Sequence, residues 1–199
     1  MPDSSRSVLR YDNGGTTGAY EWGFQAQEDA DKDNKIHEWF KLGLCPNFED
    51  RRARESELLR QYKSPTALPP VKDEECAKLV IDFLTGLKEC VDEFFKDDET
   101  VSQTPREYII TVPAIWDHAE QHKTRECAER AGMGKGSQLQ IISEPEAAGI
   151  YALDKMLKIG IKEGDTFVIC DAGGGYVYPL PFVLQSCENH RHHNRPEFR

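Results

Sequence analysis

The feature that most constrains this chain is an apolar segment that runs directly into an acidic residue and three glycines. Residues Thr166 to Cys170 are predicted to form a strand, and Asp171-Ala172-Gly173-Gly174-Gly175 follows it. Glycine has no Cβ, so backbone N–H groups can approach an anion closely, and an aspartate beside them can hold a metal ion. The segment is therefore typical of a phosphate-binding loop. The alternative is an ordinary junction between a strand and a turn.

The residues before this loop alternate between strand and helix patterns. Strands are predicted at Glu107 to Val112 and Leu139 to Ile142, and helices at about Asp117 to Ala131 and Glu144 to Lys158. Asp117 can cap the first helix, Glu120 can complete a capping box, and Gly132 ends the helix. This β-α-β-α-β order predicts an α/β fold.

The first hundred residues predict a hairpin and a long helix. Ser7 to Ala26 reads as two strands joined by a loop from Asp12 to Gly18. Asp73 to Phe95 is predicted to be helical because apolar residues recur at three- and four-residue spacing, which predicts one buried face. These residues are Ala77, Val80, Phe83, Leu84, Leu87, Val91 and Phe94. A surface helix at Phe48 to Tyr62 and a proline-marked linker after it are expected between the two.

The charge balance limits the partners that this chain can have. Its 199 residues carry a formal net charge of −10, whereas nucleic acid and anionic membranes attract basic surfaces. Neither is expected as a partner. No signal peptide or membrane-spanning segment is apparent, so a soluble, cytoplasmic protein is expected. The six cysteines contain no C-x-x-C pair, which favours reduced, structural thiols.

Three consecutive blocks resemble the nucleotide-binding domain of heat-shock-seventy, or DnaK-type, chaperones. They are IITVPAIWDHAEQHKTRECAERAG, LQIISEPEAAGIYALDK and TFVICDAGGG, and both their order and their spacing match that family. The resemblance covers about Arg106 to Gly175. It implies a partial actin-like ATPase fold, which is ribonuclease-H-like, comprising mostly lobe one with the first strand of lobe two.

The same resemblance implies which residues would handle the nucleotide. Glu144 would help organise the water and metal around the γ-phosphate, and Asp171 would help hold magnesium, so these two are the candidate catalytic residues. The backbone N–H groups of Gly173, Gly174 and Gly175 would face the phosphates of ATP or ADP. A protein client or a co-chaperone is the partner that the family implies.

The chain departs from the family pattern directly after the glycines. The family continues with a threonine, an apolar residue and a second aspartate, whereas this sequence has Tyr176, Val177 and Tyr178. Pro179 and Pro181 are expected to interrupt the strand that should follow. Two hypotheses follow: part of a domain that binds and hydrolyses Mg-ATP to drive lobe movement, or a non-catalytic remnant or interaction module. The second is favoured for this chain taken alone.

The expected organisation follows from these patterns. Residues 1–105 would form a peripheral subdomain of lobe one, 106–159 a core segment of that lobe, and 160–178 the start of lobe two with the phosphate loop. Residues 179–199 are expected to be a disordered tail. The loss of pattern after Gly175 also suggests a truncated or mis-spliced product.

Three further candidates are weaker. Asp12 to Thr17 superficially copies the family's first phosphate loop, but with one residue too many. Gly134 to Ser137 is similar to part of a P-loop, yet it lacks the first glycine and the hydroxyl residue after lysine. His118 and His122 stand one helical turn apart, but Glu120 between them points to another side of the helix, so solvent-facing histidines are favoured over a zinc site.

Overall fold

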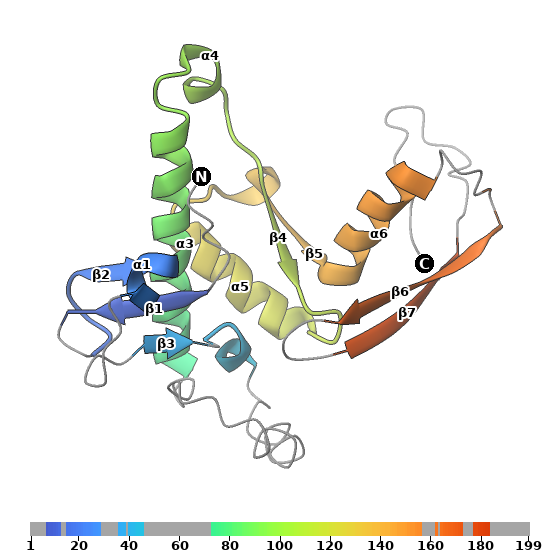
Figure 1. The fold of residues 1–199 in the computed structure, drawn as a ribbon, viewed down its shortest axis with the longest axis horizontal. Coiled ribbons are helices and arrows are strands. Elements are labelled where there is room, and N and C mark those ends of the chain that lie inside the picture. Colours follow the sequence, from blue (N-terminus) through green and yellow to red (C-terminus); the bar gives the residue numbers. More distant parts are fainter. Residues whose placement is uncertain are drawn as a thin grey trace, which may run out of the picture. The chain divides into compact units, whose positions relative to one another are not determined.

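The computed structural model describes residues 7–12, 15–28, 36–38, 40–45, 73–156, 162, 164–172 and 177–183 (Figure 1). These residues form a mixed α/β structure, as the sequence predicts. The elements are β1 (Val8–Tyr11), β2 (Tyr20–Trp22), α1 (Gly23–Glu28), β3 (Ile36–Glu38), η1 (Leu42–Leu44), α3 (Asp73–Phe94), α4 (Glu99–Ser102), β4 (Tyr108–Val112), α5 (His118–Arg130), η2 (Gly136–Gln138), β5 (Leu139–Ser143), α6 (Glu144–Met156), β6 (Thr166–Ala172) and β7 (Val177–Val183).

The chain divides into two compact units. The first comprises residues 1–108 and 116–140, and the second comprises residues 109–115 and 141–199. The predicted surface helix at 48–62, the linker after it and the glycines at 173–175 lie outside the described residues. The predicted domain boundaries stay predictions. None of the described helices is both long and apolar enough to cross a membrane.

A small antiparallel sheet begins the first unit. Its strand order is β2-β1-β3, with Leu9 opposite both Trp22 on β2 and His37 on β3. The predicted hairpin is thus confirmed at β1 and β2, but its second strand is shorter than predicted, because helix α1 begins at Gly23. Val8, Leu9 and Tyr11 on β1 are buried, so the central strand supplies this sheet's contribution to the core.

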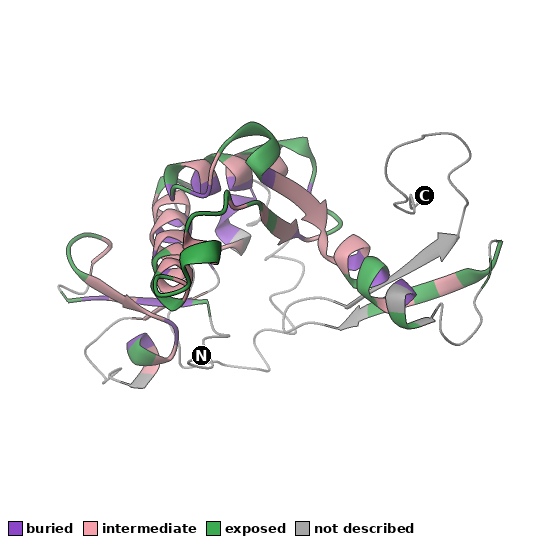
Figure 2. Ribbon diagram, turned by 90° about the horizontal axis from the view of Figure 1, so that it is seen from above, coloured by how far each residue is buried: buried purple, intermediate pink, exposed green. Residues whose placement is uncertain are grey.

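Helix α3 is the long helix that the sequence predicts, and it packs against β1, η1 and α5. Its most buried apolar residues are Cys76, Leu79 and Val80 near its beginning, and Figure 2 shows buried positions on both α3 and α5. The prediction that Phe94 belongs to the core is wrong, because its side chain is 57% exposed. Its ring packs instead against the adjacent Phe95, with centroids 4.9 Å apart.

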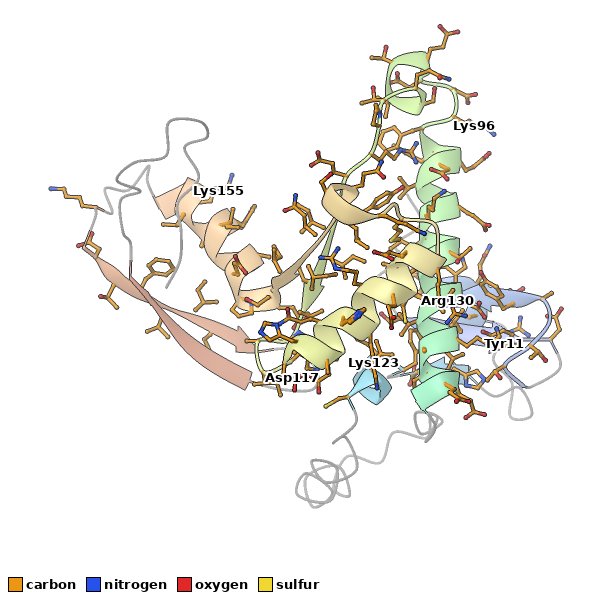
Figure 3. The ribbon with its side chains drawn as sticks, turned by 180° about the vertical axis from the view of Figure 1, so that it is seen from behind. Tyr11, Lys96, Asp117, Lys123, Arg130 and Lys155 are labelled. Atoms are coloured by element: carbon orange, nitrogen blue, oxygen red, sulfur yellow. The ribbon has the colours of Figure 1, made fainter. Side chains whose placement is uncertain are left out.

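A polar cluster joins β1 to α3. The Tyr11 hydroxyl donates a hydrogen bond to the Asp82 carboxylate, which also forms an ion pair with Lys78. The Tyr20 hydroxyl donates to the backbone oxygen of Asp82 over 3.0 Å. Figure 3 shows Tyr11 beside α3. Burial raises the pKa of Tyr11 above its ordinary value, and the neighbouring Asp82 carboxylate raises it further.

Replacing Tyr11 tests this cluster through the pH dependence of stability. The unfolded chain releases the tyrosine proton near pH 10, whereas the raised pKa retains it in the folded chain. The stabilisation is therefore complete below about pH 10 and is lost as the pH rises above that value. Tyr11→Phe should lower the free energy of unfolding by about 1.5–3 kcal/mol at pH 7. Denaturant titrations should show a shallower alkaline decline in the variant, and an unchanged decline would contradict the account.

Gly86 on α3 lies under the indole of Trp22. A Cβ added at Gly86 would lie 2.6 Å from Trp22 Nε1, and the indole is held edge-on against Phe83 with ring centroids 5.7 Å apart. Alanine normally stabilises a helix relative to glycine by about 1 kcal/mol. Here the steric conflict should dominate.

We therefore expect Gly86→Ala to destabilise the chain by about 1–2 kcal/mol, the usual scale for overpacking. The same substitution in a Trp22→Leu background should stabilise it, because the indole is gone. A double-mutant cycle measured by chemical denaturation checks both values. If Gly86→Ala instead raised the free energy of unfolding in the native background, the Trp22 side chain would have moved aside at little cost, which would contradict this expectation.

Both ends of α5 are closed by local hydrogen bonds. The predicted capping box is confirmed: Asp117 Oδ1 accepts from the backbone N–H of Glu120 over 3.4 Å, and Glu120 Oε2 accepts from the N–H of Asp117 over 2.7 Å. At the other end, Gly132 adopts a φ of 81°, and the N–H of Met133 donates to the carbonyl of Ala128. This is a Schellman ending, so Gly132 stops the helix as predicted.

Helix α5 connects two paired strands. β4 and β5 form a two-stranded sheet, and Figure 1 shows the two running in the same direction. Such a pairing needs a crossover connection, which α5 supplies. The Arg125 guanidinium on α5 donates from Nη1 to the carbonyl of Leu139 at the start of β5 over 2.6 Å. The crossover therefore brings the carboxyl ends of both strands to one edge of the sheet.

The second unit also contains a β6–β7 hairpin, and here one expectation is wrong. Pro179 and Pro181 do not interrupt the strand after the glycines: β7 runs through both, opposite Cys170 and Val168. Proline cannot donate to a strand ladder, but in an antiparallel pair every second residue points its N–H away from its partner strand. Because the prolines are two residues apart, both can occupy such positions.

Candidate functional site

The candidate site lies at the carboxyl ends of strands in the second unit. Val112 ends β4, Ser143 ends β5 and Ala172 ends β6. Figure 1 places these ends, together with the first turn of α6, at the same end of this unit. Strand ends of this kind are where ligands most often bind in α/β folds, because the loops that follow them are free to vary.

Glu144 is the first residue of α6 and follows β5 without an intervening loop. Its side chain is half-buried, while the next residue, Pro145, is buried. Proline suits the first turn of a helix because the N–H that it lacks has no partner there. The backbone of Glu144 therefore lies at a direct junction of strand and helix, where Pro145 restricts its rotation.

A capping box that the sequence analysis missed fixes this junction. Ser143 Oγ accepts from the N–H of Glu146 over 3.2 Å, and Glu146 Oε2 accepts from the N–H of Ser143 over 3.3 Å. The signal was available in the sequence as S-x-x-E, the pattern in which both side chains satisfy N–H groups at the helix start. Glu146 is thus engaged in the cap, which distinguishes its role from that of Glu144.

Asp171 lies in β6, opposite Tyr178 of β7, and Ala172 lies opposite Val177. The strand extends two residues further than predicted, so the acidic residue belongs to the ladder. Residues 173–176 connect the two strands of the hairpin and include all three glycines. Those glycines lie outside the described residues. Glu144 and Asp171 therefore belong to the same unit, on two elements, α6 and β6, that pack against each other.

Glu120, which lies between the two histidines considered as zinc ligands, has a structural role. Glu120 is only 2% exposed, and its Oε1 accepts a 3.2 Å hydrogen bond from the Cys45 thiol in addition to its part in the capping box. It lowers the pKa of Asp117, chiefly through the hydrogen bond between their side chains. Within the described segments, no three His, Cys, Asp or Glu side chains gather to form a metal site.

The two glycine-containing alternatives lie at turns in the described residues. Gly134 and Gly136 adopt positive φ values of 86° and 60°, which suits the turns between α5 and β5. Asp12 closes the β1–β2 hairpin, where its N–H donates to the carbonyl of Ala19 over 3.2 Å.

The fold is that of an α/β protein, and its strand ends are a candidate anion-binding site. Comparison with known proteins shows which family the chain resembles. No protein-family model matches the chain. It is 40% identical over 78 residues to a chaperone protein HscA homolog from Acidithiobacillus ferrooxidans, covering 39% of this chain and 11% of that protein. It is 44% identical over 68 residues to the chaperone protein HscA of Proteus mirabilis, covering 34% and 10%.

A third relative is the chaperone protein dnaK of Emiliania huxleyi, 35% identical over 82 residues, or 40% of this chain and 12% of that protein. In each case the match spans about a tenth of the relative's length. The resemblance inferred from the sequence is therefore confirmed: over 34–40% of its length, this chain is similar to heat-shock-seventy chaperones.

The cap at the start of α6 can be tested without any ligand. Ser143→Ala removes the oxygen that accepts from the Glu146 N–H, and losing such a cap should lower the free energy of unfolding by about 0.5–2 kcal/mol. Ser143→Asp should restore most of the loss, because aspartate caps equally well. Ser137→Ala at an exposed position is the matched control. Equal denaturation midpoints for the two alanine variants would exclude the capping role.

Proposed function

We propose that this chain binds a magnesium nucleotide at the strand ends of its second unit, in the manner of a heat-shock-seventy ATPase domain. The observation that carries the proposal is the β6–β7 hairpin. In this hairpin one residue, Ala172, separates Asp171 from a four-residue connection, residues 173–176, that contains three glycines. Glu144 starts a helix in the same unit.

The donor set suits a magnesium nucleotide. Carboxylate oxygens are the ligands that Mg²⁺ prefers, and it is commonly held by one or two carboxylates together with phosphate oxygens. Asp171 would hold the ion, which would neutralise phosphate charge, and Glu144 would orient a water molecule near the terminal phosphate. The N–H groups of Gly173, Gly174 and Gly175 would contact phosphate oxygens. For the whole protein, a client polypeptide or a co-chaperone is the partner we propose.

The alternative is a non-catalytic protein that retains the shape of the site. Tyr176 and Tyr178 favour it, because phenols stand where the family has a hydroxyl that contacts phosphate and a carboxylate near the metal. Nucleotide binding by backbone N–H groups can survive such changes more readily than hydrolysis, which needs a positioned water molecule. We therefore propose binding as the retained property and slow or absent turnover.

Thermal melts with and without Mg-ADP test binding. A ligand at one hundred times its dissociation constant stabilises the folded state by about 2.7 kcal/mol, which for a chain of this size raises the melting temperature by about 5–10 °C. Asp171→Ala should abolish the shift, and Glu144→Gln should retain it with ADP. Asp165→Ala changes an exposed acidic residue just before β6 and should leave the shift intact.

The outcomes separate the two hypotheses. A wild-type melt that Mg-ADP does not move would overturn nucleotide binding. If the melt moves, phosphate release from Mg-ATP decides between them: turnover that Glu144→Gln abolishes would establish an ATPase, whereas a shift without phosphate release would establish a binding protein.

A further inference from the structure

The connection between α4 and β4 carries an exposed threonine that is followed by a proline. Residues 103–107 belong to no helix or strand, and Gln103, Thr104, Pro105 and Glu107 are exposed. Figure 1 shows α4 and this connection at the carboxyl end of α3. Because proline disfavours helical backbone in the residue before it, the Thr104 hydroxyl lies in an irregular, exposed segment. Protein kinases accept substrates in such segments.

The same hydroxyl group helps to hold the short helix α4. Thr104 Oγ1 donates a hydrogen bond to the carbonyl of Thr100 over 2.6 Å, and the Thr104 N–H donates to the carbonyl of Val101 over 3.2 Å. At the start of α4, Asp98 Oδ1 accepts from the N–H groups of Thr100 and Val101. None of the four residues of α4 is buried. Because so short a helix is marginal by itself, it depends on these hydrogen bonds more than on packing.

We propose that Thr104 is phosphorylated by a proline-directed serine/threonine kinase and that the phosphate opens α4. Kinases of this class require a proline directly after the acceptor, which Pro105 supplies. Thr104 Oγ1 attacks the γ-phosphorus of the kinase-bound Mg-ATP, the bond from that phosphorus to the β,γ-bridging oxygen breaks, and ADP leaves. The hydroxyl proton passes to the catalytic aspartate of the kinase. The product is a phosphate ester, so the donor to the Thr100 carbonyl is lost.

The charge of the phosphate adds repulsion to the loss of this donor. Phosphothreonine carries a charge of about −1.5 to −2 at pH 7, and three consecutive exposed carboxylates stand at the start of α4. These are Asp97, Asp98 and Glu99. The nearest basic residues along the chain in either direction, Lys96 and Arg106, form ion pairs with Glu93 and Asp92. The phosphate must therefore compete with a carboxylate to gain either cation, and the folded form of α4 is disfavoured.

Kinase treatment of the folded full-length chain tests the modification. One other serine is followed by proline, at Ser64-Pro65, outside the described residues, so Ser64→Ala provides the background. A mitogen-activated protein kinase and, separately, a cyclin-dependent kinase would be supplied with Mg-ATP. At least one of them should add close to one phosphate per chain, which mass spectrometry should map to Thr104. Thr104→Ala in the same background should take up none. Failure of both kinases to modify Thr104 would overturn the proposal.

NMR of the phosphorylated chain tests whether α4 opens. The Cα chemical shifts of Glu99–Ser102 should be helical before phosphorylation and should move most of the way to random-coil values after it, while those of β1 stay in place. Thr104→Val removes the hydroxyl donor without adding charge and should cause a smaller change. Salt at about 1 M, which screens charges beyond about 3 Å, should reduce the difference between the two. Helical shifts that phosphorylation leaves intact would overturn the proposal.

Discussion

The crossover from β4 through α5 to β5 is the constraint on which the rest of the structure depends. Two strands can run side by side in the same direction only if the connection returns the chain to the starting edge of the sheet. Asp117 and Glu120 fix where α5 begins, and Gly132 fixes where it ends. Local hydrogen bonds therefore set both ends of α5.

Four acidic residues near helix starts and strand ends differ in their surroundings. Glu120 and Glu146 each complete a capping box and satisfy backbone N–H groups. Glu144 begins α6 between a strand and a buried proline, and Asp171 leads into the glycines. Residue type alone does not show which carboxylates satisfy the backbone here. The N–H groups that Glu120 and Glu146 accept from do show it for these two.

Unlike the first unit, the second keeps much of its apolar surface exposed. Five of the six large apolar side chains that are exposed among the described residues belong to it: Ile109, Ile115, Ile150, Tyr151 and Val168. β6 reads TFVIC, which is apolar on both faces, a pattern typical of strands covered on both sides.

The sequence predicted the helices and strands whose signals are local. The caps of α5, the long helix α3 and the β1–β2 hairpin follow from neighbouring residues, and all three are confirmed. Phe94 was wrongly assigned to the core because periodicity shows which side of a helix is apolar but not where its packing partners end. The prolines of β7 were misread because their effect depends on register, which no single strand reveals. The Ser143–Glu146 box was readable but overlooked.

Glycine-selective ¹⁵N labelling provides the most direct test of the central claim, that the loop after β6 binds nucleotide phosphates. Single glycine-to-alanine variants would assign the amide resonances of Gly173, Gly174 and Gly175. The account predicts that Mg-ADP shifts these three resonances while that of Gly86, buried under Trp22 in the other unit, stays in place. Unchanged resonances at saturating Mg-ADP would contradict it and leave the heat-shock-seventy likeness as ancestry without the binding function.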